Sequence, residues 1–466
     1  MFVAGDRKFD GDWYFKKIRM KQLFGTDGMR GEAGVFPLDA ATIEIVGRSL
    51  TRQLREHSGR PPRVITGRDT RESGPWIESA IHRGVVSEGG TCDSAGVMTT
   101  PGVAFLTREF DFDAGVVISA SHNPYHDNGI KVFSPSGKKI SAEIERRIEA
   151  DIRASSGSFP FDDIAVDNSN RDSYFNRYLS YLAEGFADLR LGGRKIVVDC
   201  ANGAAHELAP LLFRNFGADV VAVFRVPDGR NINLDCGSLH LEHLQRIVVA
   251  ENADLGIAFD GDADRALFVD EAGKIVDGDA VLWIMARLLS DHGELANQTV
   301  VATVMSNLGL EIALASQEIR LLRTAVGDKY VLEELINSQS SVGGEQSGHI
   351  IFPEKSLVGD GMMTALFVLE AMFEQKAALS ELTSGFTRCP QILINVKVRE
   401  KRPFDEIAEI ADAARAVEAE LGNSGRLLLR YSGTENLARV MIEGPTEEMI
   451  ADQANGLAEV IRTTLG

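Results

Sequence analysis

Most of the chain alternates short β-branched runs with helix-length amphipathic segments, and this alternation constrains the fold more than any other feature. One cycle begins at the apolar run Pro62–Thr66, and a second begins at Lys195–Asp199. A third leads from a helical pattern near Ala280–Leu289 to the apolar run Thr299–Met305. Strands that alternate with helices pack as α/β layers in which the helices cover a sheet. The sequence therefore predicts three similar α/β domains, although no repeat is visible beyond this pattern.

The order of elements changes after Pro390. A strand pattern, a long Ala/Glu-rich helix, the strands Arg426–Arg430 and Arg439–Glu443 and a final helix follow one another. This order predicts a smaller C-terminal α+β domain. The predicted parts are an N-terminal extension at 1–19, α/β domains at 20–172, 173–276 and 277–388, and the α+β domain at 389–466.

Length and charge limit the class of protein. A chain of 466 residues is too long for one hydrophobic core. Its 44% hydrophobic and 25% charged residues are ordinary for a globular protein. The net charge of -19 argues against a nucleic-acid surface, which would need basic stripes. It does not exclude an anionic substrate, because a few local cations can set the potential of one cleft.

Cysteine spacing and apolar runs indicate the compartment. The four cysteines are scattered without CxxC spacing, which favours reduced thiols over a metal or redox role. No apolar run approaches the ~18 residues that a membrane span needs. Residues 1–19 contain several charges and no apolar core, unlike a signal peptide. We therefore expect a cytoplasmic protein that binds neither a membrane nor nucleic acid.

The most specific local motif is an acidic loop at residues 260–265. Asp260, Asp262 and Asp264 alternate along it, and three such carboxylates can converge on a hard cation such as Mg²⁺ or Ca²⁺. An EF-hand is the competing interpretation, because Glu271 stands at its twelfth position. Arg265 occupies the sixth position, where an EF-hand needs glycine, and strands flank the loop. The alternative of a solvated acidic turn is weaker than a metal site.

A second polar loop, Ser119–Pro124, follows the predicted strand Ala114–Ile118. Open α/β sheets bind ligands at the carboxyl ends of their strands. The loop does not match the G-x-S-x-G elbow of serine hydrolases. Taken alone it is as typical of a structural turn as of a catalytic one, with Lys131 as a nearby candidate cation.

The loop Gly343–His349 places Glu345, Ser347 and His349 at alternate positions. On an extended segment these three side chains would face one way. A carboxylate, a hydroxyl and an imidazole together suit a polyhydroxylated ligand. The alternative is a glycine-rich bulge with incidental polar residues.

Two arginine-bearing loops complete the set. Arg430, Ser432, Gly433, Thr434 and Arg439 combine two guanidinium groups with small hydroxyl and glycine residues. Arginine forks and turn amides bind phosphate oxygens, so this loop is a candidate phosphate cradle. A capped turn with exposed arginines is the alternative. The glycine-rich turn near the N-terminus contributes Arg30.

Together these loops resemble the α-D-phosphohexomutase family over essentially residues 22–445. The matching stretches are 25–31, 119–133, 197–203, 231–233, 236–238, 260–265, 305–307, 326–331, 343–349 and 430–439. So many matches in the family's order make chance an unsatisfactory explanation.

The resemblance implies four domains around a central cleft and assigns roles to residues. Ser121 corresponds to the phosphorylated serine. The ligands of Mg²⁺ would be the Ser121 phosphate, Asp260, Asp262 and Asp264. Sugar contacts would come from Glu345 and Ser347, with His349 beside them. The phosphate that is not transferred would bind Arg430, Ser432, Gly433, Thr434 and Arg439.

The implied activity is the interconversion of glucosamine 6-phosphate and glucosamine 1-phosphate, with glucosamine 1,6-bisphosphate as intermediate and activator. The motif at 345–349 leans toward glucosamine over glucose or mannose phosphate. A phosphatase and a non-catalytic phosphosugar-binding protein are further alternatives, and the retained serine, aspartates and arginines argue against the second. Family membership also implies a homodimer.

Loose phosphoryl-transfer transition states need positioning and charge neutralisation. Mg²⁺, Arg30, Lys131 and Arg265 would supply the neutralisation, and His122, Lys131 and His349 are candidates for proton transfer. The sequence departs from the family pattern at Ala263, Lys329 and Asn436. Residues 1–19 have no counterpart in the family, which makes Met20 an alternative start.

Overall fold

The computed structural model describes residues 22–25, 27–155, 164–422, 424–432 and 436–466. The chain forms two compact units: Met1–Val269 with Lys355–Leu366, and Asp270–Glu354 with Phe367–Gly466. The predicted extension at 1–19 and the alternative start at Met20 lie outside the described residues. The domain bounds inferred from the sequence stay a prediction.

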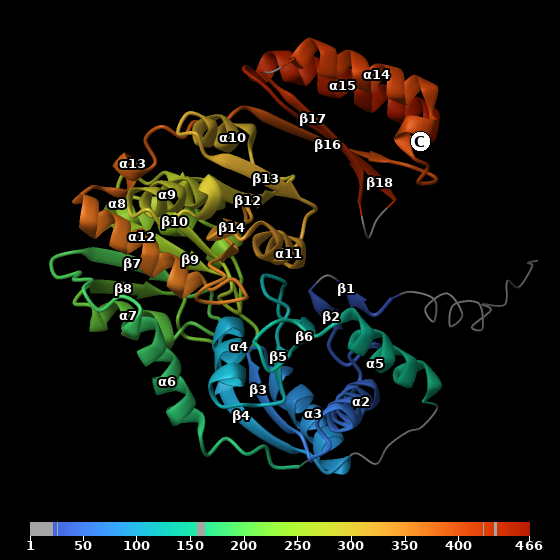
Figure 1. Cartoon of the computed structure of the whole chain (residues 1–466), viewed down its shortest axis with the longest axis vertical. Helices are drawn as coiled ribbons and strands as arrows, with labels where there is room; N and C mark the ends of the chain where they lie inside the picture. Colours follow the sequence, from blue (N-terminus) through green and yellow to red (C-terminus); the bar gives the residue numbers. More distant parts are fainter. Residues whose placement is uncertain (1–21, 26, 156–163, 423, 433–435) are drawn as a thin grey trace, which may run out of the picture. The chain divides into compact units, whose positions relative to one another are not determined.

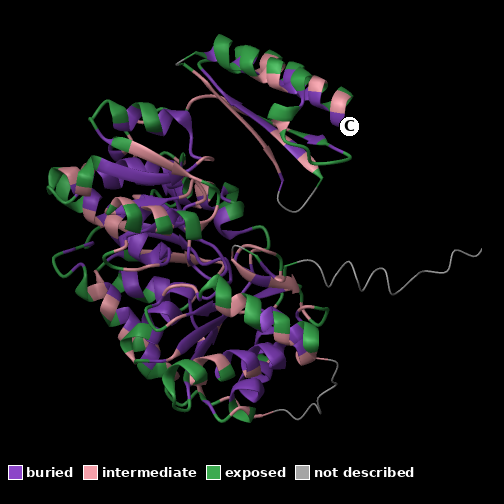
Figure 2. Cartoon of the chain, turned by 45° about the vertical axis from the view of Figure 1, so that its right-hand side comes forward, coloured by how far each residue is buried: buried purple, intermediate pink, exposed green. Residues whose placement is uncertain are grey.

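The first unit contains a six-stranded sheet of order β1-β2-β6-β5-β3-β4 (Figure 1). The strands are β1 (Phe24–Gly25), β2 (Gly28–Glu32), β3 (Arg63–Arg68), β4 (Thr91–Val97), β5 (Ala114–Ile118) and β6 (Asp127–Phe133). The helices are α2 (Ala40–Ser58), α3 (Gly74–Ser87), α4 (Thr100–Glu109) and α5 (Ala142–Ala154). Strand β3 pairs in parallel with β4 and β5, whereas β6 runs antiparallel to β5. Every residue of β5 is buried, as expected for a strand covered on both faces (Figure 2).

Close packing of two helices in this unit depends on two glycines. A Cβ at Gly47 of α2 would lie 2.5 Å from the Ile81 carbonyl oxygen, and one at Gly84 of α3 would clash with the Glu44 carbonyl oxygen. Any side chain there would force the two helices apart. Helix α2 begins at Asp39, whose carboxylate accepts a hydrogen bond from the Thr42 amide.

The second sheet of this unit contains β10, β9, β7 and β8 in that order. Their bounds are β7 (Lys195–Asp199), β8 (Asp219–Val223), β9 (Leu255–Phe259) and β10 (Ala266–Asp270), with α6 (Arg171–Glu184) before them and α7 (Leu208–Asn215) and α8 (Glu242–Ala250) between them. Strand β7 pairs in parallel with β8 and β9. The acidic loop lies between β9 and β10, at the carboxyl end of a fully buried strand.

The second unit has two sheets, of order β13-β12-β14-β15 and β16-β18-β17. The strands of these sheets are β12 (Thr299–Thr303), β13 (Arg320–Thr324), β14 (Val342–Gly344), β15 (Ile350–Ile351), β16 (Gln391–Lys397), β17 (Arg426–Tyr431) and β18 (Leu437–Glu443). The short strand β11 (Ile275–Val276) is part of neither sheet. The remaining helices are α9 (Gly278–Asp291), α10 (Leu308–Ala315), α11 (Asp328–Ser338), α12 (Gly361–Gln375), α13 (Leu379–Leu382), α14 (Ala408–Leu421) and α15 (Glu447–Leu465). The C-terminal sheet is antiparallel, and its apolar side packs with α14 and α15 in one core.

This architecture confirms the predicted fold class of three α/β domains and a smaller α+β domain.

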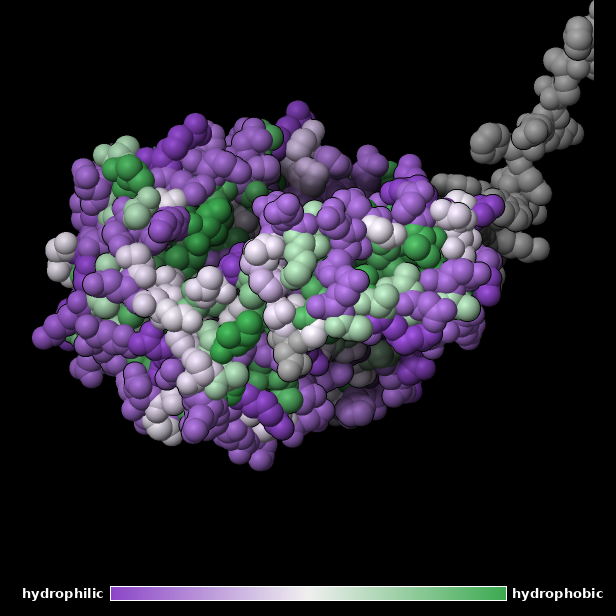
Figure 3. Space-filling model, turned by 90° about the horizontal axis from the view of Figure 1, so that it is seen from above, coloured by the Kyte–Doolittle hydropathy of each residue, from purple (hydrophilic) through white to green (hydrophobic). Residues whose placement is uncertain are grey.

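On the face drawn in Figure 3, hydrophilic side chains predominate and apolar ones form small scattered groups. None of the described helices is both long and apolar enough to cross a bilayer.

A buried carboxyl group makes the first unit's stability depend on pH. Asp360 accepts hydrogen bonds from the Tyr178 hydroxyl (2.7 Å) and from the Met362 and Met363 amides (both 3.1 Å). Burial raises the pKa of Asp360 from 3.8 to about 6. Since the folded state binds this proton more tightly, ionisation opposes folding, and stability falls as pH rises from about 4 to about 6.

We expect Asp360→Asn to remove this dependence. The unfolding free energy of the variant relative to the wild type should rise by ~3 kcal/mol from about pH 4 to about pH 7. Urea unfolding at several pH values measures it, with the exposed Asp172→Asn as control. A difference that stays constant with pH would contradict the argument.

Candidate active site

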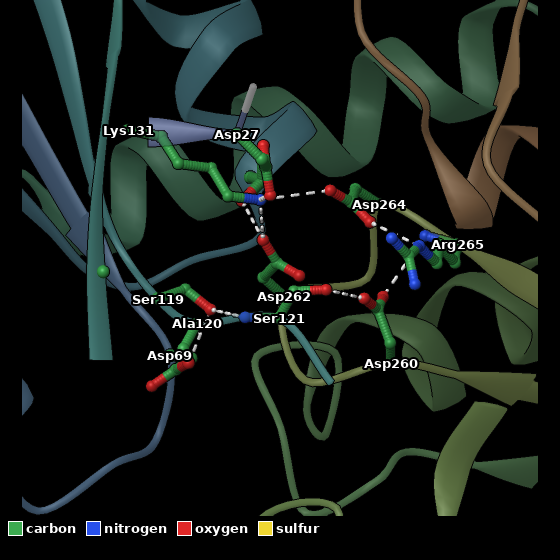
Figure 4. A network of polar contacts seen from close by, with 12 residues as sticks. Asp27, Asp69, Ser119, Ala120, Ser121, Lys131, Asp260, Asp262, Asp264 and Arg265 are labelled. Atoms are coloured by element: carbon green, nitrogen blue, oxygen red, sulfur yellow. Dashed lines mark hydrogen bonds and ion pairs between the residues drawn. The ribbon is translucent and has the colours of Figure 1, made fainter. Parts of the chain in front are cut away.

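Ser121 lies just beyond the carboxyl end of β5 and is completely buried in this structure (Figure 4). Its backbone φ is 53°, in the left-handed region that residues other than glycine rarely adopt. The Ser121 amide donates a 2.9 Å hydrogen bond to the Ser119 hydroxyl. The loop therefore holds this serine in one constrained conformation.

A buried arginine, Arg71, forms hydrogen bonds with the backbone of the loop that carries Ser121. The guanidinium of Arg71 donates to the carbonyl oxygens of Ser121 (3.0 Å), Asn123 (2.9 Å) and Pro124 (2.6 Å). Asp69 pairs with Arg71 Nε at 2.9 Å and accepts a 2.6 Å hydrogen bond from Ser119 Oγ. Both charged side chains are fully buried.

Sequence reasoning missed this support. The signal was present, because Asp69 and Arg71 follow the carboxyl end of β3, where α/β sheets place functional groups. Asn233 was also missed as an individual residue, and its Nδ2 donates to the Ser121 carbonyl oxygen at 2.9 Å.

The acidic loop at residues 260–265 lies beside Ser121. One carboxylate oxygen of each of Asp260, Asp262 and Asp264 lies within 4.8 Å of the others, and all three residues are buried. The Ser121 hydroxyl donates a 2.5 Å hydrogen bond to Asp260. A Cβ at Gly261 would lie 2.5 Å from the Ser121 carbonyl oxygen, so glycine permits this approach of the two loops.

The charge of this triad fits a cation. Burial, followed by the charges of Asp264 and Asp262, raises the pKa of Asp260 well above its usual value. Asp262 Oδ1 is buried and accepts no hydrogen bond from the described residues. Oxygen ligands alone suit a hard divalent ion. The triad can therefore bind a metal.

Ala263 occupies the position where glycine is more common in the resembled family. Its φ is 55°, so the loop uses a left-handed residue there, and alanine tolerates this at a cost of ~1 kcal/mol. The substitution leaves the three aspartates converging.

Lys131 is a buried cation beside the acidic triad. Its Nζ lies 2.9 Å from Asp262, 3.1 Å from Asp27 and 3.2 Å from Asp264. Burial lowers the pKa of Lys131, but these carboxylates raise it well above its usual value overall. Lys131 is therefore charged at neutral pH. Arg30 pairs with Asp27 and donates to the Ala120 carbonyl oxygen at 3.2 Å.

His122 and Arg265 lie on the other side of the serine. Arg265 Nη1 donates to His122 Nδ1 at 3.0 Å, and the same His122 nitrogen lies 3.3 Å from Ser121 Oγ. Burial and then the Arg265 charge lower the pKa of His122 to about 4. The imidazole is therefore neutral at pH 7, and Nδ1 accepts.

In the second unit, the loop between β14 and β15 is a tight turn. The Gly348 amide donates to the Glu345 carbonyl oxygen at 2.9 Å, and Gly348 has a φ of 89°. The segment is therefore not extended, and the condition under which the three side chains would face one way is not met. The Ser347 hydroxyl still donates to Glu345 (3.4 Å), and His349 Nε2 lies 3.9 Å from Asp328.

The predicted phosphate loop joins β17 and β18. Arg430 and Arg439 are direct partners across these strands. Burial and then Arg439 lower the pKa of Arg430, and Arg439 Nε is buried without donating to any described residue. Two like charges beside a buried donor favour an anion between them. Ser432 is buried, whereas Gly433 and Thr434 lie outside the described residues.

The structure thus groups the predicted residues by unit. Ser121, His122, Arg30, Lys131, Arg265 and the three aspartates form one constellation in the first unit. The second unit holds Glu345, Ser347 and His349 on one turn, and Arg430 and Arg439 on one strand pair.

Comparisons with known proteins agree with this fold. Four domains of the phosphoglucomutase/phosphomannomutase family match the chain: alpha/beta/alpha domain I at 21–157, domain II at 176–273, domain III at 277–389 and the C-terminal domain at 393–460. The chain belongs to this family.

Two relatives are similar to the chain over nearly their whole length. The chain is 50% identical to phosphoglucosamine mutase of Solibacter usitatus over 446 residues, covering 96% of this chain and 99% of the relative. It is 45% identical to phosphoglucosamine mutase of Chlamydia abortus over 450 residues, covering 96% and 98%.

Solved structures share the fold. A phosphoglucomutase/phosphomannomutase family protein from Burkholderia thailandensis matches with a TM-score of 0.77 and 23% identity, over 95% of this chain and 97% of that one. N-acetylphosphoglucosamine mutase of Aspergillus fumigatus, solved with GlcNAc-6P and magnesium, matches with a TM-score of 0.66 and 20% identity, over 95% and 96%.

Proposed function

We propose that the chain is a phosphoglucosamine mutase that interconverts glucosamine 6-phosphate and glucosamine 1-phosphate through a phosphorylated Ser121. The observation that carries this proposal is the 2.5 Å contact between the Ser121 hydroxyl and Asp260 within a buried acidic triad. A nucleophile beside a divalent-cation site is what phosphoryl transfer through an enzyme phosphate requires. Relatives of 45–50% identity bear the name of this enzyme.

The reaction exchanges phosphoryl groups between oxygens. The bond between phosphorus and Ser121 Oγ breaks as a bond to the oxygen of the free sugar hydroxyl forms. That hydroxyl gives up its proton, and Ser121 Oγ takes one up as it leaves. The product is glucosamine 1,6-bisphosphate. After the sugar exchanges its two ends, the bond between the other phosphorus and its sugar oxygen breaks as Ser121 Oγ bonds to that phosphorus. Ser121 Oγ loses its proton in this step, and the sugar oxygen gains one.

Three cationic side chains can neutralise the charge of the transferred phosphoryl group. Lys131, Arg265 and Arg30 lie around Ser121 and can stabilise the charge on the transferred group. Asp260, Asp262, Asp264 and the Ser121 phosphate would hold Mg²⁺, which supplies further neutralisation when bound. His122, which is neutral and contacts Ser121 Oγ, and Lys131 remain the candidates for proton transfer in this unit.

The second unit would hold the remainder of the substrate. Glu345, Ser347 and His349 would bind the sugar. Arg430, Ser432 and Arg439, with Gly433 and Thr434, would bind the phosphate that is not transferred. This binding positions either end of the sugar for reaction. The homodimer and the cytoplasmic location stay predictions.

Asp262→Asn should remove metal binding, since it deletes one of three converging charges. We expect Mg²⁺ to raise the Tm of the wild type and not that of the variant, because only a site that binds the metal couples it to folding. The exposed Asp291→Asn should respond like the wild type. Equal Mg²⁺-induced shifts in all three proteins would place the metal elsewhere.

The substrate is tested by comparing kcat/KM for glucosamine, glucose and mannose phosphates, with Mg²⁺ and a trace of sugar bisphosphate. We expect a preference for the glucosamine phosphate of about tenfold or more, equivalent to ~1.4 kcal/mol. A preference for glucose or mannose phosphate would overturn the substrate and keep the chemistry. Binding without turnover of any of them would favour a phosphosugar-binding protein.

A further inference from the structure

A buried polar network in the second unit connects two loops that the proposed function uses. Its central residue, Asn307, is fully buried and caps α10, where its Oδ1 accepts from the Gly309 amide at 2.9 Å. The same side chain donates from Nδ2 to Glu443 at 3.0 Å and to the Cys389 carbonyl oxygen at 3.0 Å. One asparagine therefore fixes both the start of a helix and the end of β18.

Glu443 ties this point to the strand that carries Arg430. Its side chain is fully buried and pairs with Arg426, the first residue of β17, at 2.7 Å. It also accepts a 3.2 Å hydrogen bond from the Leu308 amide. Arg426 in turn donates to the Ser306 carbonyl oxygen at 2.9 Å. Arg426 and Glu443 are direct partners at one end of the β17–β18 pair. Hydrogen bonds therefore join this end of the two strands to the turn before α10.

The network continues to the sugar loop. The backbone amide of Asn307 donates a 2.9 Å hydrogen bond to Asp279 Oδ2, and Gln346 Nε2 donates to the same oxygen at 3.3 Å. Gln346 stands between Glu345 and Ser347, and its carbonyl oxygen accepts from the Gly278 amide at 3.0 Å. A Cβ at Gly278 would clash with the Glu345 carbonyl oxygen, so the start of α9 is pressed against this loop.

The central side chains Asn307, Glu443 and Asp279 are polar and buried, and the proposed reaction assigns them no step. Buried polar groups lose free energy when they lose a partner, so the hydrogen bonds among them favour one arrangement of the elements that they join. The elements joined here are the turn of Glu345 and Ser347, through Asp279, and the strand pair of Arg430 and Arg439, through Glu443. These are the two places where the proposed substrate would be held.

We infer that Asn307 and Glu443 are positioning residues that fix the phosphate-binding strands β17 and β18 relative to the sugar loop. This inference rests on the proposed function. A fixed separation between these strands and the sugar loop would help the enzyme to retain the bisphosphate while the sugar exchanges its two ends. The reason is that the binding energy of the phosphate that is not transferred depends on where its binding groups are placed. Loosening the contact should weaken substrate binding and release the intermediate.

The test uses Asn307→Asp, Glu443→Gln and the double variant in the full-length protein. Asn307→Asp alone places a carboxylate opposite that of Glu443. In the double variant the new amide at position 443 can donate to the new carboxylate at position 307 and still accept from Arg426. We expect Asn307→Asp to raise KM for glucosamine phosphate and the fraction of turnovers that release bisphosphate, each about tenfold, with kcat at saturation changed less. The double variant should recover most of both losses.

A purely structural role predicts a different pattern. It would lower the amount of folded protein and Tm without moving KM or bisphosphate release. Glu374→Gln, which breaks an exposed pair with His292 in the same unit, is the matched control and should behave like the wild type. Variants with wild-type KM and wild-type bisphosphate release would overturn the inference. A wild type without mutase activity would instead overturn the proposed function.

Discussion

Ser121→Ala is expected to lower kcat by about 10⁴-fold or more while the protein stays folded. The variant lacks the oxygen that would carry the transferred phosphoryl group. Alanine accepts the same left-handed backbone as serine, and the change removes one hydroxyl that donates to Asp260. The unfolding free energy should therefore change by no more than ~2 kcal/mol. Steady-state kinetics and thermal unfolding measure the two effects.

Ser136→Ala is the matched control for this variant. Ser136 is exposed and lies outside the constellation around Ser121. It should retain wild-type kcat. Ser121→Ala protein with kcat comparable to this control would exclude a covalent role for the serine.

Arg71→Met is expected to have the second largest effect. Methionine keeps much of the length of the side chain but leaves Asp69 buried without its charge partner. Removing one partner of a buried pair costs ~3–5 kcal/mol of unfolding free energy. The carbonyl oxygens of Ser121, Asn123 and Pro124 also lose their donor. We therefore expect both a lower free energy of unfolding, measured by urea denaturation, and a lower kcat in the folded fraction.

An exposed ion pair of the same domain provides the comparison. Arg60 pairs with Asp113 at 2.8 Å with half of its side chain exposed, and such pairs contribute ~1 kcal/mol or less. Arg60→Met should thus be nearly as stable and as active as the wild type. Should Arg71→Met match it in both measurements, the buried arginine would have no role in holding the serine loop.

The sequence predicted those features that depend on local pattern. The predicted run Thr299–Met305 contains β12, which ends at Thr303, and Asn307 is the N-cap of α10, a position where asparagine is common. The three aspartates were predicted to converge because they alternate along one loop. Periodicity and capping chemistry act over a few residues, so they can be interpreted from the chain alone.

Features that depend on contacts across the chain could not be predicted in this way. Strand β2 has a single buried residue and two glycines, so its pairing with β6 left no hydrophobic pattern. Arg71 contacts Ser121 across 50 positions of sequence. The turn at Glu345–Gly348 depends on a positive φ at Gly348, and the alternation of polar residues did not decide between an extended segment and a bulge.

Transfer of the enzyme's own phosphate tests the account most directly. The protein would be charged with radiolabelled sugar bisphosphate, freed of small molecules, digested and analysed for the labelled peptide. A parallel sample would be mixed with unlabelled glucosamine 6-phosphate and Mg²⁺. We expect label on Ser121 alone and its passage to the sugar within the time of one turnover. Label on another residue, or label on Ser121 that passes only to water, would contradict this expectation.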